Sequence, residues 1–434
     1  MTVEDEKFDA IVVGAGPAGS AAALTMAKAG LSVVVVERGD YPGAKNVMGG
    51  VMFRQATQSV FGNFWEADNV VERAVVDQRL WMLGKNSAVT AGFRSEEFAQ
   101  PPYNAFTVLR AKTDPYFAKM AEDAGAFLVN ETQVTDVIFD HGKAVGVRTG
   151  REGDLYADMI LMAEGINAFA AVRAGLRKDF TMDTSALAVK EIHALPPETI
   201  NARFNVKDGE GVTILLLGEF SHDMMGSGWI YTNKDTLSLG FGGITSHMVE
   251  TKVRPNDLIE EMKAHPAVKP LLEGSEIKEY SAHLIPEVKY DELPRPYGDG
   301  YMLLGDTAGF VNFLAQEGSN LAIVSGKLAG ETAVAAKQKG DFSAETLQLY
   351  HKKLQDSFVL KDLYDLRNAP SFFRSHREFF GVYPRILNRA AQEFLTIDEE
   401  TKKQTMRQIF KMVRRKRPLW RIGKDMAEAV WALK

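Results

Sequence analysis

Three glycines and one acidic residue near the N-terminus have the spacing of a phosphate-binding site. Gly14, Gly16 and Gly19 fit G-x-G-x-x-G, and Glu37 follows 18 residues after the last of them. Gly14 permits a tight turn, Gly16 lets backbone amides approach a pyrophosphate, and Gly19 lets a helix pack closely. The Glu37 carboxylate can accept hydrogen bonds from ribose hydroxyls. The pattern predicts a dinucleotide-binding site.

A strand, a helix and a second strand are needed to position these residues. The apolar run 10–13 precedes the first glycine, 20–29 reads as an Ala-rich helix closed by Gly30, and the apolar run 31–36 ends at Glu37. The three elements make one βαβ unit, with the pyrophosphate on free N–H groups at the positive end of the helix. The alternative is a tight turn in an ordinary α/β core.

Two segments much later in the chain can contact the same cofactor. Gly305-Asp306 follows a buried strand at 301–304, and Gly318-Ser319-Asn320 opens a helix over 321–337. An Asp at a strand end suits hydrogen bonding to a sugar-alcohol chain, and a helix start can stabilise negative charge on a reduced flavin. N-caps of a structural helix are the alternative. Segments so far apart favour FAD, which is long, over NAD.

The middle of the first half offers two weaker candidates. The Gly-rich segment 38–51 directly follows the ribose-binding strand and can lie along a long cofactor, or it is a plain surface connection. Arg110 precedes a helix over 114–124 and can face the cofactor phosphates, or it is a surface residue. Beyond residues 14–19 there is no second G-x-G-x-x-G, so a dedicated NAD(P)H domain is not expected, and electrons must come from another protein or a substrate that reaches the flavin.

Composition limits the function further. The net charge of −6 gives no nucleic-acid signal, and the absence of cysteine excludes a cysteine nucleophile and any cysteine-ligated cluster or zinc in this chain. The charged start of the chain does not resemble a signal peptide, and no stretch has the apolar length of a membrane span. We expect a protein that is cytoplasmic or sits on a membrane surface.

The length of 434 residues predicts two or three domains of class α/β. Strand-like alternation between residues 185 and 280 predicts a mixed sheet, with a helix over 255–272 inside it, and residues 134–149 predict a hairpin. The predicted domains are a discontinuous FAD-binding Rossmann domain (1–75, 105–180 and 295–340), a mixed β-sheet substrate domain (76–104 and 181–294) and a helical C-terminal region (341–434).

The C-terminal segment 401–434 is strongly basic. It carries eleven Lys or Arg residues against Asp425 and Glu428, with apolar residues such as Phe410, Trp420 and Trp431 between them. Such a segment can lie on anionic lipid or dock on an acidic protein. A solvated helical face is the third interpretation.

These motifs resemble the glutathione-reductase-like FAD family of the hydroxylase type. Segments 45–50, 231–240, 320–326 and 357–363 look more narrowly like FixC, and the likeness runs nearly end to end. FixC proteins resemble electron-transfer-flavoprotein:quinone oxidoreductases that lack the iron–sulfur domain, which fits the absence of cysteine. Glu164 stands where the wider family usually has Asp, and Ser319 stands in a segment where Gly-Met-Asn is more usual.

The resemblance implies one bound FAD, a quinone acceptor (we expect menaquinone) and attachment to the inner face of the cell membrane. It also implies two partners, a two-subunit electron-transfer flavoprotein, often electron-bifurcating, and a small ferredoxin-like iron–sulfur subunit. No side chain is needed as a nucleophile, because a flavin carries the chemistry. The predicted cofactor-binding residues are Gly14, Gly16, Pro17, Ala18, Gly19, Glu37, Arg38, Lys45, Asn46, Gly49, Gly50, Arg110, Glu164, Gly165, Gly305, Asp306, Gly318, Ser319 and Asn320.

The quinone pocket is expected around residues 226–231 and the Gly242-Gly243 turn. Trp229 and Tyr231 can line an apolar channel there, or they are core residues. His193 and His222 are candidate proton donors, or ordinary hydrogen-bonded histidines.

The first alternative function is a geranylgeranyl reductase, which shares the FAD framework and a Gly-x-Gly-Trp-Ile stretch. Those enzymes often carry cysteine near the flavin, and this chain has none. An aromatic-ring monooxygenase and a redox-silent structural subunit of an electron-transfer complex are the others.

Overall fold

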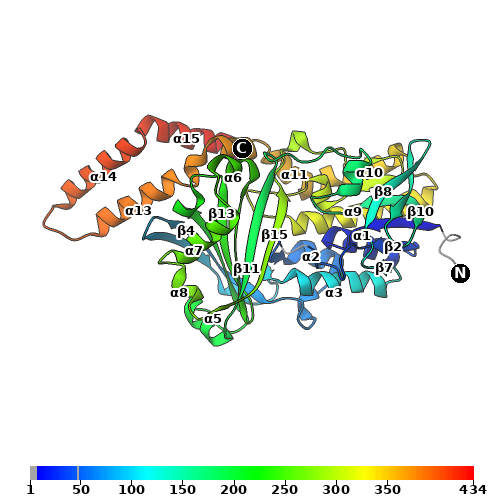
Figure 1. Cartoon of the computed structure of the whole chain (residues 1–434), viewed down its shortest axis with the longest axis horizontal. Coiled ribbons are helices and arrows are strands. Elements are labelled where there is room, and N and C mark those ends of the chain that lie inside the picture. The colour runs from blue at the N-terminus through cyan, green and yellow to red at the C-terminus, as the bar shows by residue number, and fades with distance from the viewer. Residues whose placement is uncertain (1–6, 46–47) are drawn as a thin grey trace. The chain divides into compact units, whose positions relative to one another are not determined.

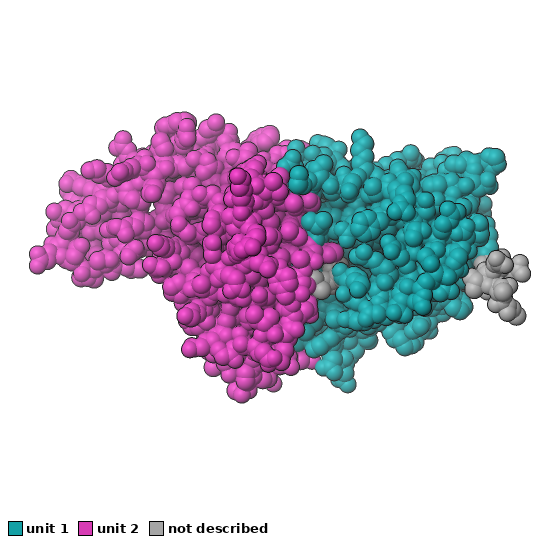
Figure 2. Space-filling model, in the orientation of Figure 1, with its two compact units in different colours: residues 1–72, 104–184, 284–364 teal, residues 73–103, 185–283, 365–434 magenta. Residues whose placement is uncertain are grey.

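The computed structural model describes residues 7–45 and 48–434 (Figure 1). The chain divides into two compact units, each built from three separate stretches (Figure 2). Unit 1 comprises residues 1–72, 104–184 and 284–364, and unit 2 comprises 73–103, 185–283 and 365–434. The helices after residue 341 are therefore shared between the two units and do not form a third one.

Unit 1 is a parallel sheet flanked by helices. The strands follow the order β16-β17-β10-β1-β2-β7, with all neighbours parallel except the antiparallel pair β16–β17, and the hairpin β8–β9 joins through β10. Its elements are β1 (Phe8–Val13), α1 (Pro17–Lys28), β2 (Val33–Val36), β3 (Val51–Phe53), α2 (Arg54–Phe61), β6 (Ala105–Thr107), α3 (Arg110–Asp123), β7 (Phe127–Val129), β8 (Val134–Asp140), β9 (Lys143–Thr149), β10 (Asp154–Met162), α4 (Phe169–Arg173), β16 (Tyr297–Gly298), β17 (Tyr301–Leu303), α9 (Ser319–Lys339), α10 (Ala344–Asp356) and α11 (Phe358–Asp365).

The first strand of unit 1, β1, is apolar because it lies at the centre of the sheet. β1 lies between β2 and β10, and Ile11 and Val12 are fully buried. A parallel strand covered on both faces needs a continuous apolar run. Helices α1 and α9 pack so closely that a Cβ atom on Gly326 would lie only 2.1 Å from the Ala18 carbonyl oxygen, and glycine permits this approach.

Unit 2 contains a mixed sheet. Its strands follow the order β15-β11-β14-β13-β12-β4, with β5 paired to β4; β4 and β12 are parallel, whereas the pairs joining β12, β13, β14 and β11 are antiparallel. Its elements are β4 (Arg73–Leu83), β5 (Ala88–Arg94), β11 (Ser185–Ala194), α5 (Pro197–Phe204), β12 (Glu210–Gly218), β13 (Gly226–Thr232), β14 (Thr236–Ile244), α6 (Thr245–Thr251), α7 (Pro255–Ala264), α8 (Lys269–Leu272), β15 (Glu276–Pro286), α12 (Ala369–Ser375), α13 (Val382–Leu395), α14 (Lys402–Lys416) and α15 (Leu419–Ala432).

The single helix predicted over 255–272 is wrong, because the chain forms two helices there, α7 and α8. His265 has an extended backbone (ψ 134°) and precedes Pro266, and a residue before proline disfavours the helical conformation. The His265 ring also hydrogen-bonds the Gly84 carbonyl oxygen through Nε2 at 2.9 Å. Tertiary contact and local sterics together end α7 at Ala264.

The C-terminal helices pack as neighbours within unit 2. α13 contacts α14, and α15 contacts α12 (Figure 1). None of the helices within residues 7–45 and 48–434 has both the length and the apolar composition needed to cross a bilayer.

Candidate functional site

The glycine-rich turn of unit 1 has the geometry that its sequence predicts. Gly14 has φ +100°, and a Cβ atom there would lie 2.4 Å from the Ala163 carbonyl oxygen, so only glycine fits. A Cβ atom on Gly19 would lie 1.9 Å from the Gly14 carbonyl oxygen. By contrast, a Cβ atom on Gly16 would meet nothing within 4 Å, so its side faces open space. The turn is tight where the protein packs on itself and open where a ligand can approach.

Glu37 ties this turn to the loop after β2. Its Oε2 accepts a hydrogen bond from the Ala15 amide at 2.9 Å, and its Oε1 accepts from the Gly39 amide at 2.7 Å. A carboxylate oxygen can accept more than one hydrogen bond, so a ribose hydroxyl can still be bound. Arg38, next to it, is exposed.

In the described part of the Gly-rich segment 38–51, Gly43 lies beside α3 and Gly49 lies beside the start of α9. A Cβ atom on Gly43 would lie 2.7 Å from the Arg110 carbonyl oxygen, and one on Gly49 would lie 2.7 Å from Ser319 Oγ. Lys45 is exposed, Gly50 is half-buried, and Asn46 lies outside the described residues. The loop therefore approaches two other predicted segments at glycines.

Arg110 is buried, which excludes the surface alternative. Its guanidinium binds Asp114 through Nε at 2.6 Å and donates to the Met48 carbonyl oxygen through Nη1 at 2.9 Å. Burial lowers the pKa of Arg110, but the carboxylate of Asp114 outweighs this and holds it above its usual value. Sequence reasoning missed Asp114 as the partner because it started the helix at residue 114, whereas α3 starts at Arg110 and makes the two residues an i, i+4 pair.

The Gly305-Asp306 segment lies between α1 and α9. A Cβ atom on Gly305 would meet the Cβ atoms of Ala18 and Ala322, each at 3.2 Å, and the Gly305 amide donates to Ser325 Oγ at 3.1 Å. Burial raises the pKa of Asp306 to about 6, against the opposing charge of Arg110. Ser325 is a supporting residue that sequence reasoning missed.

The start of α9 carries an unsatisfied polar atom. Asn320 Nδ2 donates to Glu317 Oε2 at 2.7 Å, whereas its buried Oδ1 has no hydrogen-bond partner among the described residues. Buried polar atoms in native proteins nearly always have a partner, so this oxygen indicates a ligand atom. Gly318, Ser319 and the free amides of this helix start stand at the same point of the fold.

Glu164 has both carboxylate oxygens engaged by its own chain. They accept hydrogen bonds from the Ala170 and Ala171 amides of α4, each at 3.0 Å. Burial raises the pKa of Glu164 although these amides and Arg177 oppose the shift. Gly165 accepts from Thr307 through its carbonyl oxygen at 3.1 Å. The structure thus gives Glu164 a helix-capping role, and its contact with a cofactor stays a prediction.

The residues of unit 1 fit a bound FAD on three observations. Gly16 leaves open space at the N-terminus of α1, Asn320 Oδ1 lacks a partner among the described residues, and Arg110, Asp306, Gly49 and Ser319 converge. The donors and acceptors of the site come from segments far apart in the chain, as a long cofactor requires.

The quinone-pocket candidates lie on the sheet of unit 2. The rings of Trp229 and Tyr231 stack with centroids 6.4 Å apart, and both side chains are half-buried. Gly240 on β14 makes room for the indole, because a Cβ atom there would lie 2.2 Å from Trp229. Burial raises the pKa of the Tyr231 hydroxyl, so it stays protonated.

Both candidate histidines are hydrogen-bonded to carboxylates. The His193 ring contacts Glu191 at 2.8 Å and Ser275 at 2.9 Å, and His222 contacts Glu261 at 2.8 Å. The bonds agree with the interpretation of His193 and His222 as ordinary hydrogen-bonded histidines. Their role as proton donors stays a prediction.

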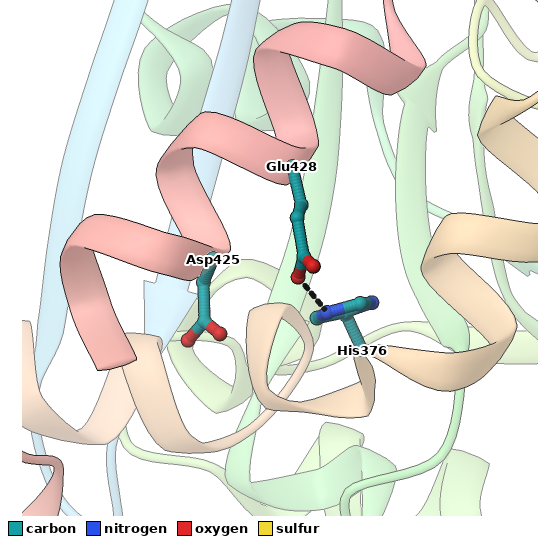
Figure 3. A group of neighbouring side chains, drawn as sticks. All are labelled: His376, Asp425 and Glu428. Atoms are coloured by element: carbon teal, nitrogen blue, oxygen red, sulfur yellow. Dashed lines mark hydrogen bonds and ion pairs between the residues drawn. The ribbon is translucent and has the colours of Figure 1, made fainter. Parts of the chain in front are cut away.

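Three side chains of unit 2 are close enough to suggest a metal site, namely His376, Asp425 and Glu428 (Figure 3). The carboxylate oxygens of Asp425 and Glu428 already have partners within the protein. Asp425 accepts from Arg417 Nε at 2.6 Å, and Glu428 pairs with His376 at 3.0 Å and with Lys424 at 3.7 Å. The cluster is an ion-pair network that joins α15 to α12 and α14.

Comparison with known proteins agrees with the site. Residues 9–166 match the FAD dependent oxidoreductase family, and residues 369–434 match the ETF-QO/FixC family C-terminal domain. The structure also resembles a geranylgeranyl bacteriochlorophyll reductase-like protein from Thermoplasma acidophilum, with a TM-score of 0.73 and 20% identity over 95% of this chain and 97% of that one. The flavin-dependent brominase Bmp2 has a TM-score of 0.65 at 18% identity, covering 94% of this chain and 100% of that one. Fold and site together define an FAD-dependent oxidoreductase.

Sequence relatives narrow the class to one family. The chain is 46% identical to Protein FixC of Bradyrhizobium diazoefficiens over 398 residues, which is 91% of each chain. It is 44% identical to Protein FixC of Azotobacter vinelandii over 94% of each chain. It is also 38% identical to the "Probable electron transfer flavoprotein-quinone oxidoreductase YdiS" of Escherichia coli K12, over 91% of this chain and 92% of that one. The chain belongs to the FixC family.

Proposed function

We propose that this protein passes electrons from a two-subunit electron-transfer flavoprotein, through a small ferredoxin-like iron–sulfur subunit, to a membrane quinone as part of an electron-bifurcating complex. The observation that carries the proposal is the similarity, over more than nine-tenths of each chain, to FixC proteins and to the YdiS protein, whose name includes both donor and acceptor. The absence of cysteine supports a cluster on a separate subunit. Menaquinone is the acceptor we expect.

When bound, FAD accepts and releases the electrons, and the residues of unit 1 hold and tune it. The amides of the α1 N-terminus bind the pyrophosphate, and Glu37 binds the ribose. Asp306, with its pKa raised to about 6, binds the sugar-alcohol chain. The amides at the start of α9 would favour negative charge on a bound ring, and the buried, unpartnered Asn320 Oδ1 is available to accept a hydrogen bond from the cofactor.

The sheet face around Trp229 is the proposed wall of the quinone pocket. Gly240 lets the indole lie flat against β14, and Tyr231 stacks beside it. Small-molecule pockets are lined mainly by apolar and aromatic side chains, and aromatic rings stack on planar rings such as that of a quinone. No side chain is assigned as a nucleophile, and the proton source is solvent through polar groups near the ring.

An anaerobic reoxidation experiment tests the acceptor. The purified flavoprotein is reduced with light, a short-chain menaquinone analogue is added, and the return of flavin absorbance is followed. We expect rapid return with the analogue and a slow return with buffer alone. A Trp229→Ala variant should bind FAD as the wild type does and reoxidise more slowly, with a raised half-saturating analogue concentration.

Two results would contradict the proposal. A flavin that stays reduced with the analogue but reoxidises with a geranylgeranyl lipid would favour a prenyl reductase, whose framework the fold shares. A flavin that is reduced by NAD(P)H and then consumes oxygen would favour a monooxygenase.

A further inference from the structure

The sheet of unit 2 has two unlike faces. Residues of one face, such as Ile230, Leu239 and Phe241, are fully buried in a large hydrophobic cluster. Successive strand residues point to opposite faces, and paired residues of neighbouring strands share a face. The residues between the buried ones therefore form the other face, which we call the Trp229 face. On β12 and β13 its members are all half-buried: Thr213, Leu215, Leu217, Ser227, Trp229 and Tyr231.

Among the described strands β11 to β14, the Trp229 face carries one charged residue, Lys190. Lys190 pairs with Gly240 of β14, which pairs in turn with Trp229 of β13, so the three positions lie on one face. The other residues of these four strands on this face are uncharged. Lys190 is only 7% exposed, and a lysine is rarely buried so far because its ammonium is costly to remove from water. A buried cation beside an aromatic wall suggests a functional role.

The acidic residue next to Lys190 in the chain belongs to the opposite face. There Glu191 Oε2 contacts His193 Nε2 at 2.8 Å and Lys263 Nζ at 3.0 Å. Burial opposes ionisation of Glu191, but His193 and Lys263 outweigh it and lower its pKa. Glu191 therefore has its partners on its own face, and the charge of Lys190 is left to the Trp229 face.

The indole of Trp229 extends across β14 toward the strand that carries Lys190. A Cβ atom on Gly240 would lie 2.2 Å from the indole. One on Gly242 would lie 3.6 Å from the indole and 3.5 Å from the Ala188 Cβ atom. Ala188 precedes Lys190 by two residues on β11, so it shares the face with it. Neighbouring strands lie about 4.8 Å apart, and the four methylene groups of a lysine can reach a ring stacked on this indole.

We propose that Lys190 donates a hydrogen bond to one oxygen of the quinone and stabilises the negative charge that develops there during reduction. This inference rests on the proposed function and on its assignment of Trp229 to the pocket wall. An ammonium group has three N–H donors, so Lys190 can keep a partner within the protein and still bind this oxygen. A fixed cation at low dielectric stabilises a developing charge far more than it stabilises the neutral ring.

The chemical step is balanced without consuming a proton of Lys190. Reduction of a quinone to a quinol takes two electrons, supplied by reduced flavin, and two protons, supplied by solvent. Both carbonyl oxygens become hydroxyl groups, and the ammonium of Lys190 is the same before and after the step. Its contribution is to the rate, because the charged intermediate stages are the ones that it favours.

The anaerobic reoxidation experiment tests Lys190 in the complete flavoprotein. We compare Lys190→Met, which removes the charge, with Lys190→Gln and Lys190→Arg. We expect the Met variant to be about 100-fold slower at saturating menaquinone analogue, the Arg variant to recover most of the rate, and the Gln variant to lie between them. The control is Lys278→Met on β15 of the same unit, whose side chain is 51% exposed, and it should match the wild type.

Ferricyanide separates a catalytic role from a structural one, because it oxidises the flavin without offering a quinone ring. All variants should contain as much FAD as the wild type and be reoxidised by ferricyanide at the same rate. A Met variant that is slow with both acceptors would make Lys190 a structural residue and overturn the inference. If the Met variant does not fold, the Gln and Arg variants decide the question, and equal rates with the quinone analogue would overturn it.

A binding measurement on the oxidised protein tests the charge without turnover. The probes are 2-hydroxy-1,4-naphthoquinone, which is an anion at neutral pH, and its uncharged 2-methoxy counterpart, followed by equilibrium dialysis. The wild type should prefer the anion at least about tenfold, and the preference should persist in Lys190→Arg and vanish in Lys190→Met and Lys190→Gln. A preference that survives in the Met and Gln variants would overturn the inference.

Failure of this inference is distinguishable from failure of the proposed function. If the wild type is reoxidised rapidly by the menaquinone analogue and the Lys190 variants match it, only the role of Lys190 is refuted. If the wild type itself stays reduced, the quinone acceptor is refuted and the role of Lys190 with it.

Discussion

Helices α9 and α15 differ in which of their residues are buried and which are exposed. α9 packs small residues inward: Gly326 lies against Ala18 and Gly330 against Ala22 and Thr25 of α1, so close approach of two backbones stabilises the pair. α15 buries Asp425 beside Ala432 and leaves Trp420 and Trp431 exposed. The difference shows that an amphipathic pattern identifies two faces of a helix without saying which one is buried. The partners of the polar face decide that.

The buried Arg110 and the partly buried Arg417 sharpen the comparison. Arg110 and Asp114 lie one turn apart in α3, with side chains 4% and 0% exposed, so that pair is internal to one helix. Arg417 and Asp425 have side chains 12% and 4% exposed and join the end of α14 to α15. The first pair supports a cofactor-binding core, whereas the second orients a helix.

The largest effect is expected from breaking the internal pair. Arg110→Leu leaves the Asp114 carboxylate buried without a partner, which costs about 3–5 kcal/mol of folding free energy. Urea unfolding of the FAD-free protein measures this. The double variant Arg110→Leu, Asp114→Leu should recover at least half of the loss, because no charge is left unpaired. A single variant as stable as the wild type would show that the pair is not buried as described.

Glycine substitutions test the packing contrast between the two helices directly. Gly326→Ala in α9 places a Cβ atom 2.1 Å from the Ala18 carbonyl oxygen, and such overpacking costs about 1–3 kcal/mol. Gly423→Ala in α15 meets nothing within 4 Å and removes a glycine from a helix, which should stabilise by about 0.5–1 kcal/mol. Denaturant midpoints separate the two. Equal and small effects at both positions would remove the contrast.

Asp306 makes the FAD-free protein sensitive to pH. Its pKa is raised from 3.8 to about 6, so the folded state binds the proton more tightly than the unfolded chain does. Stability therefore falls as pH rises from about 4 to about 6, by about 2 kcal/mol from this group. Asp306→Asn should flatten that part of the curve in urea unfolding of the FAD-free protein. An unchanged slope in the variant would assign the effect to another group.

Acid should release α15 with a smaller effect. Burial opposes ionisation of Asp425, but hydrogen bonds from Arg417 and Tyr383 outweigh it and hold its pKa below the usual 3.8. A lowered folded-state pKa gives stability that is present above the unfolded value and lost as pH falls below it. The protection of α15 amides against hydrogen exchange, relative to the intrinsic rate at each pH, should fall below about pH 4, before that of α9. Asp425→Asn should show fast exchange already at neutral pH.

Much of unit 1 was predictable because its determinants are local. The run 10–13, the glycines of residues 14–19 and Glu37 specify a strand, turn, helix and strand within a short stretch, and all four elements are present. The mixed sheet of unit 2 followed from alternation along its strands. The helix predicted over 255–272 instead divides into α7 and α8 at His265-Pro266, where the proline and the bond from His265 to Gly84 end the first helix.

Residues close together in the chain were enough to predict a dinucleotide site, a mixed second sheet and the basic, aromatic character of residues 401–434. The burial of Arg110 beside Asp114 and the exposure of Trp420 and Trp431 depend on how the helices pack. The reason is sequence distance. The groups that hold the polar face of α15 include Glu378, Tyr383 and His376, whose partners in the network lie 39, 42 and 52 residues further along the chain. Local periodicity carries no information about such pairs, because they form only when α12, α13 and α15 pack together.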